Sequence, residues 1–410
     1  GRRIMLVAIA VFTIASGLCA ASVNLSMLVA FRVLQGAGGA LMVPVGRLVV
    51  LRVTAKSDLI QAIAYLTWPA LLAPVIAPTL GGWIVTVASW HWIFLVNLPL
   101  GVIAFFVSAR IVPSAPDPTI ARLDWVGFLL CAAALASLLM TLELVRSREG
   151  GLWATAAVAT VLLASVGATI WWFRRTPHPL LSFEPLRVPS FRVANVGGSI
   201  YRLVINSVPF LLPLMFQLGF GWSAARSGLL LMVLFAGNVA IKPATTPLLR
   251  RLGFRTVLIW SVVGGAAVIG GLAALRPSTP LAVVLGALFV SGALRSVGFS
   301  AYNSLQFAGI PGPTLADANT LSATMQQVAA ALGVSIGALL LRVADQALGA
   351  RFSPVAPYTV ALSALALLMA YPLVQVLRLS HSAGSEVTGR YRSSAATQPE
   401  RTHQRAADQE

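Results

Sequence analysis

The chain has 410 residues, of which 58% are hydrophobic and only 10% are charged. Soluble globular domains carry about 25% charged residues, so this composition excludes a soluble protein with an ordinary core. The formal net charge of +17 is spread over short loops and the C-terminal tail. Because no basic face interleaved with aromatic residues is present, we expect a lipid bilayer as partner and no nucleic acid.

Apolar runs of about 20 residues recur along the chain, and each is long enough to cross a hydrocarbon core of ~30 Å as a helix. Lipid offers no hydrogen bonds to the backbone, so these runs are expected to be helical. They predict an all-α polytopic membrane protein with twelve spans: 4–22, 25–48, 61–87, 93–112, 124–144, 152–173, 193–218, 226–249, 256–275, 281–308, 319–343 and 357–378.

The basic residues of the connections predict the orientation of these spans. If the first span begins in the cytoplasm, most of the loop arginines lie on the cytoplasmic side, as the positive-inside rule requires. This side then holds Arg2, Arg3, Arg52, Lys56, Arg110, Arg122, Arg174, Arg175, Arg187, Arg192, Arg250, Arg251 and Arg255. We therefore expect a multi-pass protein of the inner (cytoplasmic) cell membrane with a cytoplasmic C-terminus.

A weak internal similarity indicates how the spans are grouped. Residues 1–6 (GRRIML) resemble residues 253–258 (GFRTVL), and each hexapeptide is a short basic turn leading into a span. Transporters are often built from repeated halves, and matching these turns places two further spans before Gly1. Together with a chain that starts on Gly rather than Met, this predicts an N-terminal truncation and fourteen spans in the complete protein.

The same comparison predicts four parts. Residues 1–112 would be the last four of six helices of an N-terminal bundle, and residues 113–173 two inserted linker helices. Residues 174–378 would form a six-helix C-terminal bundle. The polar residues 379–410 are expected to be a disordered cytoplasmic tail.

Several segments resemble family motifs. Gly1-Arg2-Arg3 resembles the end of the loop signature between the second and third spans of major facilitator proteins. Residues 28–40 (LVAFRVLQGAGGA) resemble the fourth-span motif of that superfamily, and residues 73–82 (APVIAPTLGG) the fifth-span antiporter motif. Residues 90–101 (WHWIFLVNLPLG) are similar to the entry to the sixth span in the fourteen-span drug:proton antiporter branch. Residues 209–221 and 299–305 resemble the multidrug-resistance MdtD-type subgroup.

This resemblance implies a major facilitator fold and a secondary active transporter that exports small amphipathic molecules or drugs by proton antiport and alternating access. The proton gradient would supply the energy, so we expect no cofactor and no metal. The resemblance assigns proton coupling and gating to Arg32, Gln35, Gly36, Pro74, Pro78, Gly81 and Gly82. The resemblance also implies that the coupling carboxylate lies in the two spans that precede Gly1, because the family carries acidic residues there; no carboxylate lies at mid-membrane in this sequence. Ala73 and Ala77 also stand where the antiporter motif usually has Gly.

Each motif residue also has a structural interpretation. Arg32 lies inside an apolar helix, where a charge costs about 2.5–3.5 kcal/mol and usually meets a cavity or a partner. It could tune the protonation of a nearby carboxylate, or it could hold the helix through an ion pair or backbone carbonyls. Gln35 could simply join helices, and the glycines around Gly36 could permit close helix approach. Pro74 and its neighbours could form a hinge or only a kinked packing helix.

The second half supplies a further set of candidates. Arg202 and Arg295 lie within apolar spans and could face a central cavity, although Arg202 is near enough to a span end to snorkel to the interface. For Lys242 we expect snorkelling. Trp68, Phe210, Phe216 and Asn303 could line an aromatic and polar substrate cavity, although aromatic residues in spans more often pack or lie at interfaces.

Motif absences narrow the class of protein. The sequence contains no Gly-x-x-x-x-Gly-Lys-Ser/Thr loop, so no nucleotide is expected as a partner. It also lacks His-Glu-x-x-His and Cys-x-x-Cys, which argues against an enzyme. The alternatives to a drug exporter are a membrane sensor derived from a transporter and a narrow-substrate metabolite exporter. In either export case the partner is a small-molecule substrate.

Overall fold

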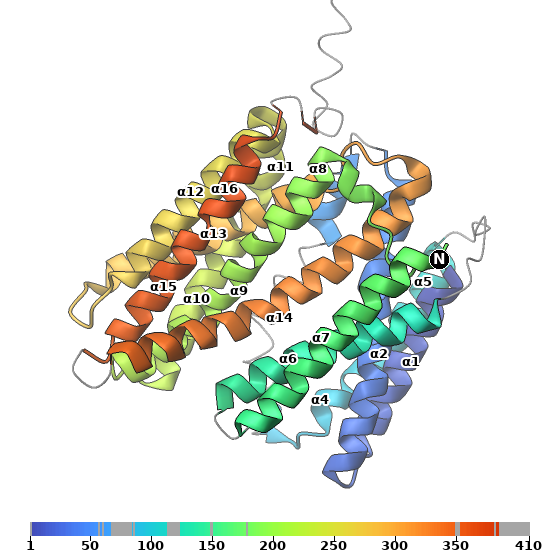
Figure 1. The fold of residues 1–410 in the computed structure, drawn as a ribbon, viewed down its shortest axis with the longest axis horizontal. Coiled ribbons are helices and arrows are strands. Elements are labelled where there is room, and N and C mark those ends of the chain that lie inside the picture. The colour runs from blue at the N-terminus through green and yellow to red at the C-terminus, as the bar shows by residue number, and fades with distance from the viewer. Residues whose placement is uncertain are drawn as a thin grey trace, which may run out of the picture.

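The computed structural model describes residues 2–55, 58–59, 61–66, 84, 87–112, 124–147, 151–177, 179–348, 353–380 and 383–384. The regular structure of these residues is entirely helical. Ten helices within them are long and apolar enough to cross a membrane, and a bent helix pair makes an eleventh. The chain is therefore a multi-pass α-helical membrane protein (Figure 1).

The N-terminal group of helices consists of α1 (Arg2–Ala20), α2 (Leu25–Val53), α4 (Trp92–Leu95) and α5 (Asn97–Ile111). Helix α1 packs against both α2 and α5. Asn24 caps α2, because its side chain accepts a hydrogen bond from the Met27 N–H. A Cβ on Gly38 would lie 2.7 Å from the Phe12 backbone nitrogen, so glycine is needed where α2 crosses α1.

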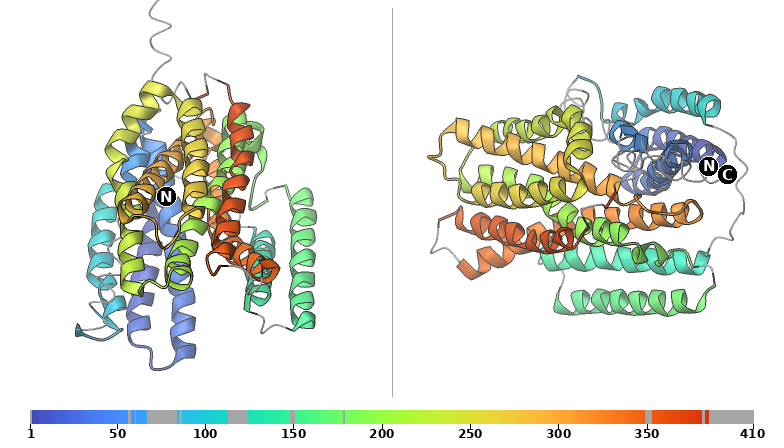
Figure 2. Two further views of the ribbon diagram at one scale, coloured as in Figure 1. Left: turned by 90° about the vertical axis from the view of Figure 1, so that its left-hand side faces the viewer. Right: turned by 90° about the horizontal axis from the view of Figure 1, so that it is seen from above.

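Helices α6 (Trp125–Ser147) and α7 (Leu152–Arg175) form an antiparallel hairpin along one edge of the molecule (Figure 2). Asp124 joins its two ends: one carboxylate oxygen accepts bonds from the Gly127 N–H at 2.8 Å and the Trp172 indole at 2.9 Å. The other oxygen accepts from the Leu180 N–H at 3.2 Å. Asp124 therefore caps the start of α6 and also holds the segment that follows α7.

The C-terminal group contains, in its described residues, five candidate membrane spans and the bent helix pair. Its elements are η2 (Glu184–Arg187), α8 (Pro189–Arg192), η3 (Val193–Gly197), α9 (Gly198–Leu214), η4 (Met215–Gly219), α10 (Ala224–Ala240), α11 (Lys242–Leu252), α12 (Phe254–Ala273), α13 (Leu281–Leu305), η5 (Gly312–Thr314), α14 (Leu315–Leu348), α15 (Ala356–Leu368) and α16 (Ala370–Leu377). Helix α9 packs on α14, α10 on α13, and α12 on both α13 and α15. The main apolar core lies among these helices.

Eleven of the twelve predicted spans therefore appear in the described residues, and the expected all-helical fold is confirmed. The span predicted at 226–249 is bent by 47° between α10 and α11, where Pro243 follows the break. The span predicted at 319–343 is longer, because α14 runs from Leu315 to Leu348. Most of the span at 61–87 and of the tail at 379–410 lies outside the described residues. The division into bundles and linker, and the fourteen-span complete protein, stay predictions.

Candidate substrate and gating site

Arg202 of α9 is the centre of a buried polar cluster. Only 2% of its surface is exposed. It donates a hydrogen bond to the Asn303 side-chain oxygen of α13 at 3.1 Å and another to the Ala194 carbonyl at 3.3 Å. Its guanidinium also lies 5.9 Å from the centre of the Phe299 ring. The structure thus brings the predicted residues Arg202 and Asn303 together, and Arg202 does not snorkel to the interface.

The donors of this cluster are not all used. The Nε atom of Arg202 and the Nδ2 atom of Asn303 are buried without a hydrogen-bond partner, and so is the Tyr302 hydroxyl. Tyr302 stacks obliquely on Tyr201, with ring centres 5.2 Å apart. Gly298 leaves room for the Tyr201 hydroxyl, which would lie 2.2 Å from a Cβ at that position. Since unpaired buried donors are costly, the cluster is suited to receive an acceptor from outside.

Arg295 of α13 lies one to two turns from this cluster and is half-buried. It lines a narrow internal cavity together with Tyr201 and Ser291. Its guanidinium carbon is 5.9 Å from the Phe235 ring centre, and its Nη1 atom is buried without a partner. The structure therefore supports the prediction of a charge inside the C-terminal group at this position.

The position of Lys242 differs from the one predicted from the sequence. Its side chain is only 2% exposed and donates a hydrogen bond of 2.6 Å to the Ser300 hydroxyl of α13. Snorkelling is therefore wrong for this residue. The physical reason is the break between α10 and α11, which places Lys242 at the first position of α11, against α13. The sequence signal was the Lys-Pro pair inside an apolar run.

The predicted aromatic residues do not share one location. Phe216 is 1% exposed and packs on Phe220 and Trp222, with ring-centre distances of 5.6 and 5.4 Å. This cluster supports the packing interpretation of Phe216. Phe210 is half-buried against the main apolar core. Trp68 lies outside the described residues.

The fourth-span motif forms a hydrogen-bonded chain in the N-terminal group. Arg32 donates to the Gln35 side-chain oxygen at 2.9 Å, and the Gln35 amide donates to the Ser16 hydroxyl of α1 at 2.5 Å. Arg32 is exposed and lies 5.1 Å from the centre of the Phe94 ring, whereas Gln35 is buried. Within the part of the chain that the structure describes, no ion pair joins Arg32 to a carboxylate. Gln35 does join two helices, as its structural interpretation expects.

Other motif residues have simpler surroundings. Gly36 is exposed, and a Cβ there would meet no atom of the described residues within 4 Å; among these residues, Gly38 permits close helix approach and Gly36 does not. Helix periodicity explains the difference, because the two residues face different sides of α2. In the loop motif, Arg2 donates to the Ala109 carbonyl at the end of α5, and Arg3 is exposed. The predicted residues Gly1, Pro74, Pro78, Gly81 and Gly82 lie outside the described residues.

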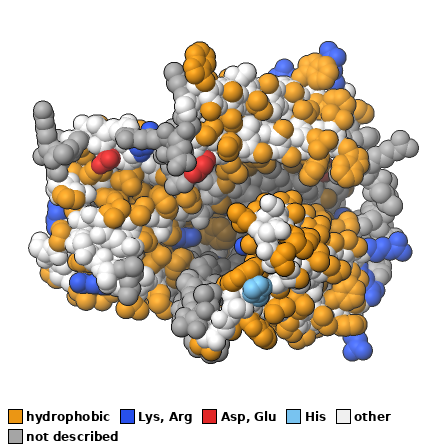
Figure 3. Space-filling model, turned by 90° about the horizontal axis from the view of Figure 1, so that it is seen from below, with side chains coloured by type: hydrophobic (Ala, Val, Ile, Leu, Met, Phe, Trp, Pro, Cys, Tyr) orange, Lys and Arg blue, Asp and Glu red, His pale blue; other side chains and the backbone are white. Residues whose placement is uncertain are grey.

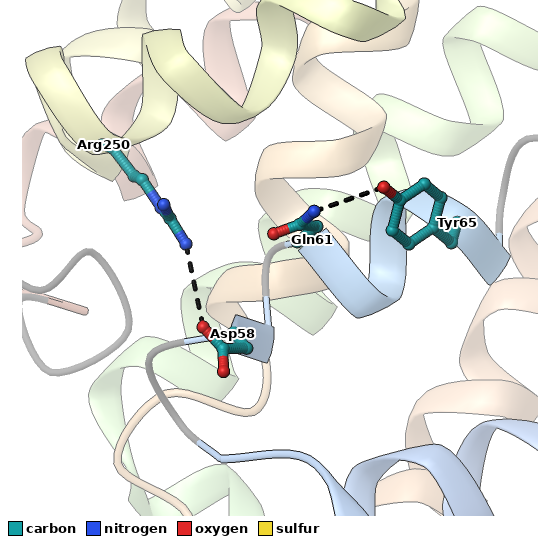
Figure 4. A network of polar contacts seen from close by, with 4 residues as sticks. All are labelled: Asp58, Gln61, Tyr65 and Arg250. Carbon is teal, nitrogen blue, oxygen red and sulfur yellow. Dashed lines mark hydrogen bonds and ion pairs between the residues drawn. The ribbon is translucent and has the colours of Figure 1, made fainter.

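The two helix groups touch at one end of the molecule, which we call the basic end because it carries Arg52, Arg192, Arg250, Arg255 and Arg378. The Asn319 amide of α14 donates to the Pro44 carbonyl of α2 at 3.0 Å. Arg250 approaches Asp58 at 4.0 Å (Figure 4), and both side chains are well exposed. Leu51 and Leu59 belong to the same apolar cluster as the C-terminal core.

Figure 3 shows the opposite end of the molecule. Viewed from below, the surface is hollowed between the two helix groups, and basic side chains are visible at the walls of the hollow (Figure 3). A further cavity of about 820 Å³ lies on the C-terminal group at the basic end and is lined by Arg192, Tyr371 and Arg378. This second cavity does not include the buried cations of α9 and α13. The hollow between the groups is therefore the better candidate for a substrate path.

Arg47 is a functional candidate that sequence reasoning missed. It lies three residues after Pro44 on α2, and it is close enough to Arg202 of α9 for the two charges to interact. Its Nη1 atom is buried without a hydrogen-bond partner. The available signal was an arginine at the last turn of a predicted span, which resembled an ordinary interfacial residue.

Sequence comparison identifies the family. The model of the Major Facilitator Superfamily matches residues 1–334, and the chain belongs to this superfamily of transporters. A relative from Pectobacterium carotovorum, named "Putative multidrug resistance protein MdtD", is 34% identical over 347 residues, which are 84% of this chain and 74% of that protein. A protein of the same name from Serratia proteamaculans is 34% identical over 350 residues, 83% of this chain and 71% of that protein.

Solved structures agree with the fold. The human organic anion transporter MFSD10 (TETRAN) superposes with a TM-score of 0.63 at 17% sequence identity. The superposition covers 92% of this chain and 76% of the MFSD10 chain. The proton:xylose symporter XylE superposes with a TM-score of 0.58 at 14% identity, over 95% of this chain and 83% of its own. At these identities the likeness concerns the fold alone. The family is one of transporters rather than enzymes, so small molecules and lipid are the expected partners.

Proposed function

We propose that this protein exports small amphipathic molecules across the cytoplasmic membrane in exchange for protons. The observation that carries the proposal is the pair of helix groups that touch at the basic end through Asn319 and Pro44, with a hollow at the other end. A transporter that alternates between two open states needs such a breakable contact on one side of its substrate path. The names of the relatives support drugs as the substrate class.

The contact at the basic end is made of interactions that can open. A single neutral hydrogen bond contributes about 0.5–1.5 kcal/mol, and an exposed ion pair such as that of Arg250 and Asp58 contributes about 1 kcal/mol or less. Such small energies favour one state without locking it, as alternation on a millisecond scale requires. By the positive-inside rule we place the basic end, and with it the C-terminus, in the cytoplasm.

Proton coupling rests on the family resemblance around Arg32. We propose that the Arg32, Gln35 and Ser16 chain transmits a change of charge near Arg32 to the packing of α1 against α2. The decisive measurement is drug and dye accumulation in cells that lack their own efflux pumps, using the complete gene and its Arg32→Ala variant, with and without a protonophore. Full-length protein should lower accumulation, and both the variant and the protonophore should abolish that effect.

Two results would contradict this proposal. If the protein lowers accumulation equally with the protonophore present, export is not driven by protons. If well-expressed protein exports none of a broad panel, a narrow-substrate exporter or a sensor is the better assignment. A C-terminal fusion to a reporter that is active only in the cytoplasm tests the orientation independently.

A further inference from the structure

The helices that carry the buried Arg202 and the half-buried Arg47 and Arg295 contain no acidic residue. Residues 1–57, which include α2, and residues 185–316, which include α9 to α13, have neither Asp nor Glu. Arg47, Arg202 and Arg295 lie within these two stretches. Moving a cation out of water costs several kcal/mol unless an anion or several hydrogen bonds offset the loss. The groups that offset the cost of burying these arginines must therefore come from other segments or from a ligand.

Carboxylates from other described segments do not supply it. The structure describes six acidic side chains, of which five are exposed: Asp58, Glu143, Glu184, Asp317 and Asp345. The sixth, Asp124, is engaged by Gly127, Trp172 and Leu180. No ion pair between a described carboxylate and Arg47, Arg202 or Arg295 is present in the described part of the chain. The local field around these arginines is accordingly positive.

The geometry also presents donors rather than acceptors. Arg47 of the N-terminal group lies near enough to Arg202 for the two like charges to repel each other. Arg47 Nη1, Arg202 Nε and Asn303 Nδ2 are all buried, and each lacks a hydrogen-bond partner. All three atoms can only donate. Guanidinium groups with free donors fit planar or tetrahedral oxyanions, whereas a cation would be repelled.

We propose that the transported molecule carries an anionic oxygen group, such as a carboxylate or sulfonate, and that Arg202 and Arg47 hold it from opposite helix groups. This inference rests on the proposed export function. Asn303 would position the Arg202 guanidinium through the 3.1 Å bond, and Phe299 would contact the apolar part of the ligand. The bound anion would also offset the repulsion between Arg47 and Arg202, so binding would favour approach of the two groups at this level.

Two dyes with the same xanthene skeleton and opposite charge test this proposal. Carboxyfluorescein is anionic, and rhodamine 123 is cationic. With the purified complete gene product, fluorescence anisotropy should show saturable binding of carboxyfluorescein, weakened about tenfold or more in Arg202→Gln and in Arg47→Gln. Arg226→Gln is the matched control, because Arg226 is exposed above the Trp222 ring, 4.0 Å from its centre, and should leave binding unchanged.

Folding and ion identity need their own controls. Each variant is checked by size-exclusion chromatography, and Arg202→Lys, which keeps the charge, should retain more binding than Arg202→Gln. If Arg202→Gln does not fold, the test relies on Arg47→Gln, because Arg47 is only half-buried. Repeating the titration at several chloride concentrations separates an organic ligand from an inorganic one. Complete displacement of the dye by physiological chloride would overturn the substrate assignment.

The outcomes for binding and for export are separable. Saturable binding of rhodamine 123 alone, or carboxyfluorescein binding that both arginine variants leave intact, would refute an anionic substrate. Export of rhodamine 123 from cells without export of carboxyfluorescein would refute it too, while leaving the proposed export function standing. If anion binding depends on Arg47 and Arg202 but cells show no export, the proposed export function is refuted and the proposed anion site stands.

Discussion

Helices α10 and α13 approach each other so closely that a methyl group at one position should separate them. A Cβ on Gly292 would lie 1.8 Å from the Leu234 carbonyl oxygen, where ordinary contact begins at about 3.4 Å. The obstacle is backbone, so one helix must move by more than about 1 Å. Overpacking costs about 1–3 kcal/mol, and we expect the upper part of this range. The better helix propensity of Ala offsets at most about 1 kcal/mol of this cost.

The matched control for Gly292→Ala is Gly286→Ala in the same helix. Gly286 is exposed, and a Cβ there would meet no atom within 4 Å. We expect Gly286→Ala to raise the apparent melting temperature slightly and Gly292→Ala to lower it by several degrees. Tryptophan fluorescence of the purified protein in detergent measures both. The reasoning is refuted if Gly292→Ala, at normal yield, melts at or above the temperature of Gly286→Ala.

Three further predictions concern other contacts. Asn319→Ala should weaken the contact with Pro44 by about 1 kcal/mol and increase hydrogen exchange at the end of α2; unchanged exchange would contradict a gating role. Burial raises the pKa of Asp124, but its three hydrogen bonds outweigh this, so the pKa lies below its usual value. The stabilisation is therefore present above about pH 4 and lost as the pH falls through the lowered pKa. Asp124→Asn should abolish this acid-dependent loss of melting temperature, and a persisting acid transition would exclude Asp124 as its source. Asp58→Ala should change stability by less than about 1 kcal/mol, because the pair with Arg250 is exposed; a larger loss would show that the pair is shielded from water.

The membrane-spanning helices could be predicted from the sequence because the constraint that produces them is local. An apolar run of sufficient length can satisfy its backbone in lipid only as a helix, whatever its neighbours are. The capping role of Asp124 is local for the same reason: a carboxylate just before a helix meets free backbone N–H groups. The motif in residues 28–40 likewise predicted the superfamily without any knowledge of packing.

What only the tertiary structure decided is which polar side chains are buried together. Lys242 was expected to reach the interface, but the bend after Ala240 directs it to Ser300, 58 residues away. Arg47 resembled an interfacial arginine, and only the structure brings its charge near enough to interact with Arg202 of α9. Gly36 and Gly38 differ by two positions in one motif, yet within the described part of the chain only Gly38 of these two touches another helix. Hydropathy determines that a segment crosses the membrane, whereas the side of a helix that faces a partner depends on residues distant in the chain, because packing is a property of pairs of helices.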